Sequence, residues 1–436
     1  MTRSELSMNL NRTIPPEIRP LGEFEIARPE RLRMKNGMPL NIIRAGSQDV
    51  VRMDVLIGGG QCHQQQPLQA MFTNRMLREG TASYTSPQIA EKLDYYGAWL
   101  ELSSSLNCGF LTLYSLNKYF PHVMEIVSDM LKHPLFPEKE LGVVREVNRQ
   151  QFLVNSTRVE VISRKHFNRA LFGESHPFGR YAEEEDYGRI TPEVLKEFYR
   201  SHYHSGNCSV YVSGNVTPEI VHCIEEQIGS AAWGEIREMS KIQLPDPCRS
   251  ENQHIFIERE DALQSSLKMG DFVMDCLHPD FLKCRIMVTL FGGYFGSRLM
   301  SNIREDKGYT YGIGAGVINY PGRSVLAIST EADNCYADSI IREVYNEMDR
   351  LCNDLPSQEE LEMVKSYMLG DLSRSYEGPF SLSDAWIYVE TAGVGDDFFV
   401  RSMDAIRNVT REEIRMMAQK YLRKETLIDV VAGKKM

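Results

Sequence analysis

The sequence of 436 residues predicts an α+β protein of two similar halves, each a mainly antiparallel sheet covered by helices. Two observations support this prediction. Segments with strand-like alternation cluster between long amphipathic helices, and the order of these elements repeats along the chain. A chain of this length also exceeds what one ordinary hydrophobic core organises. We therefore expect two domains.

Strand and helix patterns follow one another through the first half. Apolar residues alternate with polar or small ones at 51–57 and again at 110–116, which predicts strands. Apolar residues at helical spacing predict a helix over 120–131. Another helix is expected to begin at Thr191 and to lead into a strand at 209–213.

The second half repeats this order at a nearly constant spacing. A strand is expected at 325–330, a helix at 340–351, and a helix that begins at Thr410 and leads into a strand at 427–432. Loop insertions account for small drifts in the spacing, so we interpret the pattern as a duplication. The matched pairs are Leu141 and Leu361, Val144 and Val364, Leu195 and Ile414, Val212 and Val431, Gly214 and Gly433, and the segments Phe72–Leu77 and Phe295–Met300.

A join between the halves is expected where polar residues and two prolines interrupt both periodicities. We place the N-terminal half at residues 1–234, the linker at 235–250 and the C-terminal half at 251–436.

Composition excludes several classes of protein. The formal net charge of −11 argues against a nucleic-acid binder, which normally presents a basic face. The chain has no apolar run long enough to span a membrane. Nine dispersed cysteines form no C-x-x-C pair, which argues against a disulfide framework or a cysteine zinc site.

The N-terminus has no apolar core of the signal-peptide type, so we expect a cytoplasmic protein. The sequence leaves a periplasmic location open. It also leaves open whether Met1 or Met8 is the first residue.

One segment, LQAMFTNRMLREGT at Leu68–Thr81, has the frame of the inverted zinc-peptidase motif H-x-x-E-H. Met71 and Arg75 stand at the two histidine positions, and Asn74 stands at the glutamate position. The frame itself is formed by Ala70, Phe72, Met76, Leu77, Gly80 and Thr81.

With this motif and the duplication, nearly the whole chain resembles the pitrilysin/insulinase family of zinc peptidases. It is most similar in size to the two-domain branch of the mitochondrial processing peptidase and its bacterial relatives. The resemblance implies two α+β halves that face each other across a cavity. Further matching segments are Met34–Leu40, Gly58–Gly60, His133–Leu141, Leu171–Gly179 and Gly292–Ala315.

The resemblance also locates a zinc site whose ligands are missing. Zinc needs three protein ligands and a nearby carboxylate to take a proton from its water. The family's third ligand, a glutamate, falls on Gln151 by an ungapped count. Met71 offers a soft thioether, Arg75 offers no lone pair, and its charge repels a dication. We expect no metal bound by this chain.

Arg304 and Tyr311 match an arginine and a tyrosine that hold the substrate backbone in related enzymes. Guanidinium and phenol groups donate hydrogen bonds to a peptide carbonyl and stabilise developing oxyanion charge. The alternative is structural: Arg304 pairs with Glu305 or Asp306, and Tyr311 is packed.

Weaker candidates surround these residues. Gly292, Gly293 and Gly296 form either a short loop that approaches bound peptide or a turn between helices. Gly58–Gly60 is expected to end an edge strand able to pair with an extended peptide. His63, His202 and His204 are interpreted as exposed or loop-packing residues rather than ligands.

The first functional hypothesis is a noncatalytic, substrate-binding subunit of a zinc endopeptidase. A partner with an intact H-x-x-E-H motif would supply the zinc, in a heterodimer that cleaves peptides. The alternatives are a structural or peptide-binding homologue without a peptidase role, a homodimer, and a self-sufficient zinc peptidase, which the missing ligands disfavour.

Overall fold

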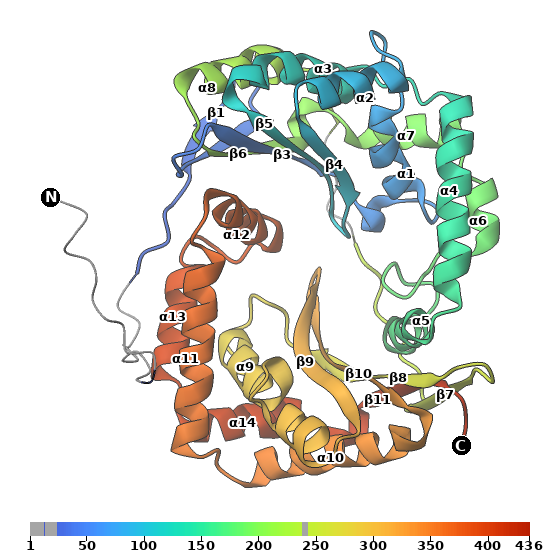
Figure 1. Cartoon of the computed structure of the whole chain (residues 1–436), viewed down its shortest axis with the longest axis vertical. Coiled ribbons are helices and arrows are strands. Elements are labelled where there is room, and N and C mark those ends of the chain that lie inside the picture. The colour runs from blue at the N-terminus through green and yellow to red at the C-terminus, as the bar shows by residue number, and fades with distance from the viewer. Residues whose placement is uncertain (1–12, 14–23, 238–242) are drawn as a thin grey trace, which may run out of the picture.

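A computed structural model describes residue 13, residues 24–237 and residues 243–436. The expectations about the first residue and about a signal peptide lie outside these residues, as does the middle of the predicted linker. Within the described ranges, no helix is both long and apolar enough to cross a membrane. Two helix-covered sheets lie at opposite ends of the molecule, so the predicted fold class is confirmed (Figure 1).

The first sheet has the strand order β1-β2-β6-β3-β5-β4. All neighbours are antiparallel except β2 and β6, which are parallel. The predicted strands at 51–57, 110–116 and 209–213 lie in β3, β5 and β6. The strand bounds are β1 Glu30–Arg33, β2 Pro39–Arg44, β3 Val50–Gly58, β4 Trp99–Ser104, β5 Cys108–Leu116 and β6 Cys208–Gly214.

The second sheet has the order β7-β11-β8-β10-β9, with a single parallel pair between β7 and β11. This order repeats β2-β6-β3-β5-β4 of the first sheet, including the place of the parallel pair. The duplication read from the sequence is therefore a duplication of topology. The strand bounds are β7 His254–Glu258, β8 Gln264–Val273, β9 Thr310–Tyr320, β10 Arg323–Asp333 and β11 Ile428–Gly433.

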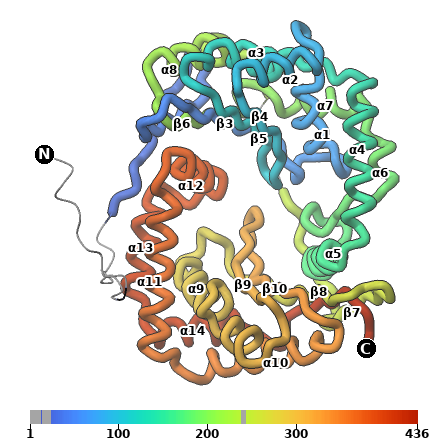
Figure 2. The backbone as a smooth tube through the Cα atoms, viewed as in Figure 1, coloured from blue at the N-terminus to red at the C-terminus, as the bar shows by residue number. Residues whose placement is uncertain are grey.

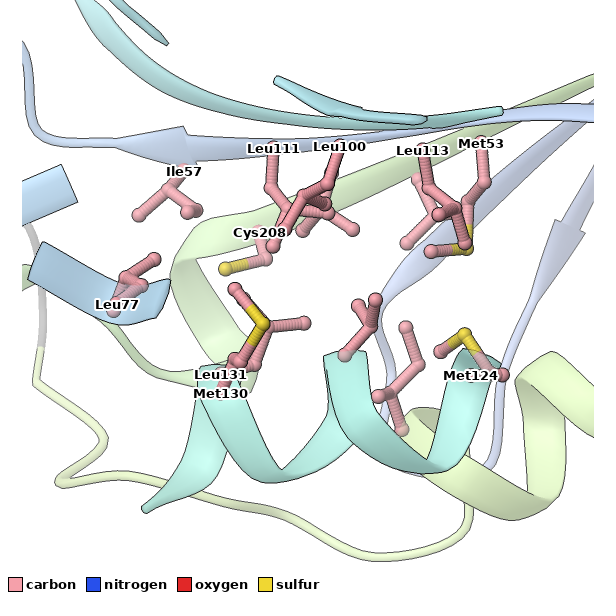
Figure 3. Packing of buried hydrophobic residues seen from close by; sticks show 14 of the residues in the cluster. Met53, Ile57, Leu77, Leu100, Leu111, Leu113, Met124, Met130, Leu131 and Cys208 are labelled. Carbon is pink, nitrogen blue, oxygen red and sulfur yellow. The ribbon is translucent and has the colours of Figure 1, made fainter. Parts of the chain in front are cut away.

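Helices cover the outer face of each sheet, and their apolar sides form the two main cores. In the first half, Met53, Leu111 and Leu113 of the sheet pack against Met124 and Leu131 (Figure 3). The helices of the first half are α1 Gln69–Arg75, α2 Ser86–Tyr95, α3 Phe120–Lys132, α4 Glu138–Ser156, α5 Val159–Phe172, α6 Glu184–Gly188, α7 Pro192–His202 and α8 Pro218–Ile224.

The second half has an equivalent set of helices. Thr191 and Thr410 cap α7 and α14 through their side chains, as expected for the two predicted helix starts. The helices are α9 Phe281–Val288, α10 Ala337–Asn353, α11 Gln358–Ser375, α12 Pro379–Ala392, α13 Phe398–Asn408 and α14 Arg411–Tyr421.

One predicted match between the halves is wrong. The segment Phe72–Leu77 lies in and just after α1, the first α-helix after β3, whereas the first α-helix after β8 is α9. Phe295–Met300 follows α9 and leads into the π-helical segment η7 (Met300–Asp306). The similarity of the two segments misled the alignment because a single short match cannot fix a register.

The halves exchange one helix each across the middle of the molecule. Helix α5 of the first half packs on β8 and β11, and helix α12 of the second half packs on β2 and β6 (Figures 1 and 2). Gly270 of β8 permits this approach, since a Cβ there would lie 2.8 Å from Cζ of Phe167. Each sheet is thus covered on its inner face by the other half, and the predicted boundary at 235–250 remains a prediction.

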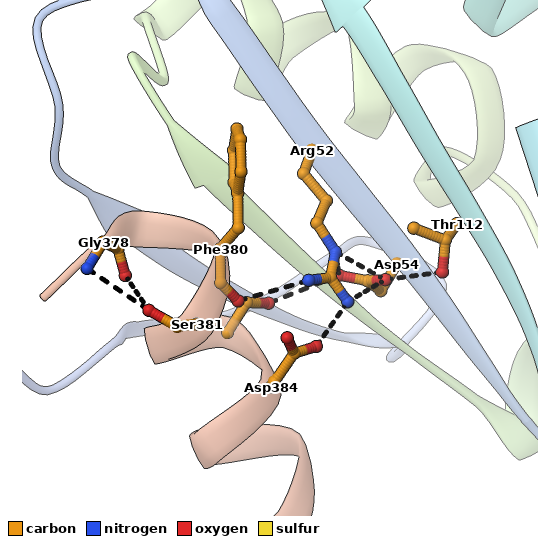
Figure 4. Close-up of polar contacts among 8 residues, drawn as sticks. Arg52, Asp54, Thr112, Gly378, Phe380, Ser381 and Asp384 are labelled. Atoms are coloured by element: carbon orange, nitrogen blue, oxygen red, sulfur yellow. Dashed lines mark hydrogen bonds and ion pairs between the residues drawn. The ribbon is translucent and has the colours of Figure 1, made fainter. Parts of the chain in front are cut away.

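A buried ion-pair network ties α12 to the first sheet (Figure 4). Nη2 of Arg52 donates to Oδ1 of Asp384 at 2.6 Å and to Oδ1 of Asp54 at 2.9 Å. The Thr112 hydroxyl donates to the same Asp54 oxygen at 2.7 Å. Both strand residues are buried because α12 covers this face of β3. Removing one partner of an ion pair buried in this way strongly destabilises the fold, because the other charge is left buried and unpaired.

Strand β3 is not an edge strand, contrary to the expectation for Gly58–Gly60. It pairs with β5 on one side and with β6 on the other. The alternating pattern predicted the strand but held no information on its neighbours. Among the described strands, the open edges belong to β1 and β4 in the first sheet and to β7 and β9 in the second.

Candidate functional site

Helix α1 presents two of the motif positions on one face. Met71 and Arg75 are one turn apart, Met71 half-buried and Arg75 exposed. Nη1 of Arg75 donates to Oδ1 of Asn148 on the neighbouring helix α4, at 3.0 Å. Gln151 lies one turn further along α4 and donates to Oδ1 of Asn155. The structure therefore brings the motif helix and the third-ligand helix together.

The chemistry at these positions does not suit zinc. One thioether, one guanidinium and neutral amides are present where imidazoles and a carboxylate would be needed. No group of three His, Cys, Asp or Glu side chains able to hold a metal gathers within the described part of the chain.

Asn74 points into the fold. Its side chain is 1% exposed and lies beside the Tyr203 hydroxyl. A Cβ on Gly109 would lie 2.9 Å from Nδ2 of Asn74 and 3.2 Å from the Tyr203 hydroxyl. Burial raises the pKa of that hydroxyl, so Tyr203 stays neutral. A neutral amide at position 74 therefore lies in a tightly packed environment without a charge.

The three histidines near this region pack inside the first half. His63 and His202 meet edge to face with ring centroids 5.2 Å apart, and His204 is fully buried. Burial lowers the pKa of all three, that of His202 to about 4. They are neutral groups, as the loop-packing interpretation expected.

Arg304 and Tyr311 lie together at one end of β9. Both line an open cavity of about 770 Å³. The Arg304 guanidinium lies 4.3 Å above the ring of Phe295, and its side chain is 32% exposed. Tyr311 is 94% exposed. The donors of both side chains are accessible to a ligand.

The structural alternative for this pair has little support from the geometry. Arg304 approaches Glu305 only at 4.0 Å, the outer limit of an ion pair. Such an exposed contact contributes little to stability. Tyr311 is too exposed to be a packing residue.

The pair lies far from the motif helix of its own chain. Tyr320, at the other end of β9, lines the cavity that contains Met71, whereas Tyr311 lines the cavity of Arg304. Nine residues of extended strand span roughly 30 Å. One chain therefore separates Arg304 and Tyr311 from the motif helix α1.

The glycines are placed for close packing. Gly292 and Gly293 end the π-helical segment η6 (Thr289–Gly293), and Gly296 lies in the turn before η7. A Cβ on Gly292 would lie 2.6 Å from Cβ of Ala315 on β9. This packing accounts for the glycine at position 292.

Sequence reasoning missed two side chains at these sites. Phe295 supports the Arg304 guanidinium, and an aromatic residue in the glycine-rich segment was an available signal. Asn148 accepts a hydrogen bond from Arg75. It lies one turn before Gln151, and a helix predicted over 138–156 would have shown that the two share a face.

Two family models match this chain. Residues 42–176 match the model described as insulinase (peptidase family M16). Residues 189–368 match the model described as the peptidase M16 inactive domain.

Relatives described as zinc proteases and relatives described as inactive are both similar to this chain. An uncharacterized zinc protease of Bacillus subtilis is 21% identical over 80% of this chain and 84% of its own length. A probable inactive metalloprotease of the same organism is 24% identical over 54% of each chain. A non-peptidase homolog of Helicobacter pylori is 23% identical over 59% of each chain.

Solved structures share the fold. A peptidase M16 inactive domain from Pseudomonas fluorescens superposes with a TM-score of 0.83 at 20% identity, over 94% of this chain and 98% of the other. A protease from Helicobacter pylori gives a TM-score of 0.82 at 15% identity, over 94% and 100%.

Proposed function

Because this chain belongs to the insulinase (M16) family of peptidases, we propose that it is the noncatalytic, substrate-binding subunit of a zinc-dependent endopeptidase. One observation carries the proposal. Arg304 and Tyr311 are accessible in a large cavity, while the motif helix of the same chain has residues that cannot ligate zinc.

The distance between these two regions supports a divided active site. With roughly 30 Å of strand between them, Arg304 and Tyr311 cannot act on a group held by Met71 and Arg75. A reacting centre beside the pair would have to come from a second chain. That partner would be an M16 subunit with an intact H-x-x-E-H motif and its zinc.

The roles of the two residues follow from their chemistry. Arg304 donates charge-assisted hydrogen bonds to a peptide carbonyl, and Phe295 fixes the plane of its guanidinium. The Tyr311 hydroxyl donates a second bond. Together they hold the substrate and stabilise charge that develops on the carbonyl oxygen.

An extended substrate also needs main-chain partners, and open strand edges provide them. Since β3 is central, the edges to consider are β4 and β9. Tyr311 is the second residue of β9, so a peptide along this edge would pass beside it.

All nine cysteines are unpaired, which favours the cytoplasm as the compartment. A homodimer would bring together two chains with the same missing ligands. It would therefore fit the structural alternative rather than a peptidase.

The test mixes the purified chain with its H-x-x-E-H relative from the same cell and measures cleavage of a fluorogenic peptide library. We expect activity in the mixture that neither protein has alone. Arg304→Ala should lower kcat/KM about 10²–10³-fold, the effect of removing one oxyanion donor.

The variant must still assemble with its partner, which gel filtration measures. Stable assembly without any cleavage would support the structural alternative. Unchanged turnover with Arg304→Ala would refute the proposed role of this residue.

A further inference from the structure

A second cavity, of about 360 Å³, lies beside the motif helix. Its wall comes from the loop after β3, the start of α1, residues 177–182 and the far end of β9. It therefore lies between the two halves, apart from the cavity of Arg304. The lining residues used below are Gln64, Leu68, Met71, Phe178, Arg180 and Tyr181.

Arg180 is the charged residue of this lining, and no acidic residue lines the cavity. Its guanidinium makes one long hydrogen bond, from Nη2 to the Gln64 carbonyl at 3.4 Å. No carboxylate in the described ranges lies within ion-pair distance of it. Nearby Arg149 and Arg169, by contrast, pair with Glu184 and Glu183.

Two further residues of the lining can donate hydrogen bonds. The Tyr181 hydroxyl accepts a hydrogen bond from Nδ2 of Asn168 at 2.7 Å, so its own proton is free to be donated. Oε1 of Gln64 accepts from the backbone of Ala70, which leaves the Gln64 amide N–H groups as donors.

The remaining wall is partly apolar and also includes Gln61, Asn168 and Tyr320. Leu68 lines it from a left-handed backbone conformation with φ of 73°, which is unfavourable for leucine and which the packing around α1 must hold. Met71 and Phe178 complete this side. The cavity thus joins a partly apolar wall to a guanidinium, a phenol and an amide that can all donate hydrogen bonds.

We infer that this cavity binds a carboxylate group of a peptide. A planar carboxylate accepts two parallel bonds from a guanidinium, and an unpaired Arg180 in a cavity without acids is preorganised for it. The inference rests on the proposed peptide-binding function and names its preferred ligand. The carboxylate is either an acidic side chain or a peptide C-terminus.

The test measures fluorescence anisotropy of the full chain with three labelled nonapeptides of alanine and serine. One has a central Asp and an amidated C-terminus, the second has a free C-terminus and no acidic residue, and the third has neither. We expect one of the two peptides with a carboxylate to bind at least about tenfold more tightly than the peptide with neither. Whichever binds identifies the source of the carboxylate.

Arg180→Gln should reduce this preference to less than about twofold, and Arg180→Lys should retain part of it because charge remains without the planar fork. Arg200→Gln is the matched control, since it removes the same charge from an exposed position on α7. Thermal unfolding checks that each variant is folded.

Equal binding of all three peptides would overturn the inference, and so would a preference that persists in Arg180→Gln. The assay needs neither a partner nor cleavage. A failure here can therefore be told apart from a failure of the mixed peptidase assay.

Discussion

The motif helix α1 and the start of strand β9 differ in where they place their polar groups. Around α1, the amide of Asn74 and the hydroxyl of Tyr203 are buried beside each other. At β9, Arg304 and Tyr311 direct their donors into an open cavity. Packing explains the first region. Packing gives no reason for an exposed tyrosine beside a partly exposed arginine at β9.

Under the proposed function, this difference separates a helix without zinc ligands from a region that binds peptide. The positions on α1 need only support the core and contact α4, which many side chains can do. Tyr311 is exposed and Arg304 partly exposed, and under the proposed function their chemistry serves a bound peptide. Substitutions in each region test this contrast.

The largest effect on stability is expected from a pair of phenylalanine variants. Phe72 is fully buried in α1, so Phe72→Ala should lower the free energy of unfolding by about 3–5 kcal/mol. Phe295 is exposed beneath Arg304, and Phe295→Ala should cost less than about 1 kcal/mol while it lowers activity of the mixed complex. Urea unfolding of both variants and the peptide assay measure these effects. Equal losses of stability would contradict the contrast.

A smaller effect is expected from pH. The folded protein holds the pKa of His202 at about 4, below its ordinary 6.5, because burial disfavours the charged ring. Stability from this group is complete above pH 6.5 and is lost as pH falls toward 4, since the unfolded chain takes up the proton first. Allowing for partial solvent access, the loss is on the order of 1–2 kcal/mol.

His202→Phe tests this expectation, because a phenyl ring fits against Phe198, whose ring centroid is 4.3 Å from that of His202. Urea unfolding at pH 7 and pH 5 should show a smaller difference in the variant than in the parent protein. A difference as large as that of the parent would assign the acid sensitivity to other groups.

The smallest effect is expected at Arg75. Its side chain is exposed and makes one hydrogen bond, to Asn148, so Arg75→Ala should change stability by no more than about 0.5 kcal/mol. Activity of the mixed complex should stay unchanged, unlike that of Arg304→Ala. A large loss of activity would mean that α1 still takes part in the reaction.

Much of the fold could be predicted because its signals are local. Alternation located β3, β5 and β10, and the capping threonines Thr191 and Thr410 marked equivalent helices. The pair of Arg304 and Tyr311 was predicted from the resemblance of one continuous segment to the family. Its accessibility was not, because exposure depends on neighbours from distant parts of the chain.

The errors came from long-range order. Strand β3 has a strand-like pattern whether it is central or at an edge, so the pattern could not exclude pairing with both β5 and β6. The buried state of Arg52 and Asp54 was also hidden, since it depends on α12, more than three hundred residues away in sequence. The absence of an ion-pair partner for Arg180 in the described ranges likewise depends on residues from distant parts of the chain.

The sequence by itself determined the duplicated α+β order, because this order depends on patterns along the chain. It also determined the absence of zinc ligands at α1 and the presence of the arginine–tyrosine pair, because these depend on residue type. Only the tertiary structure decided that helices α5 and α12 are exchanged between halves and that the pair lies in a different cavity from the motif helix. These facts arise from contacts between residues far apart in sequence, and a linear pattern does not record such contacts.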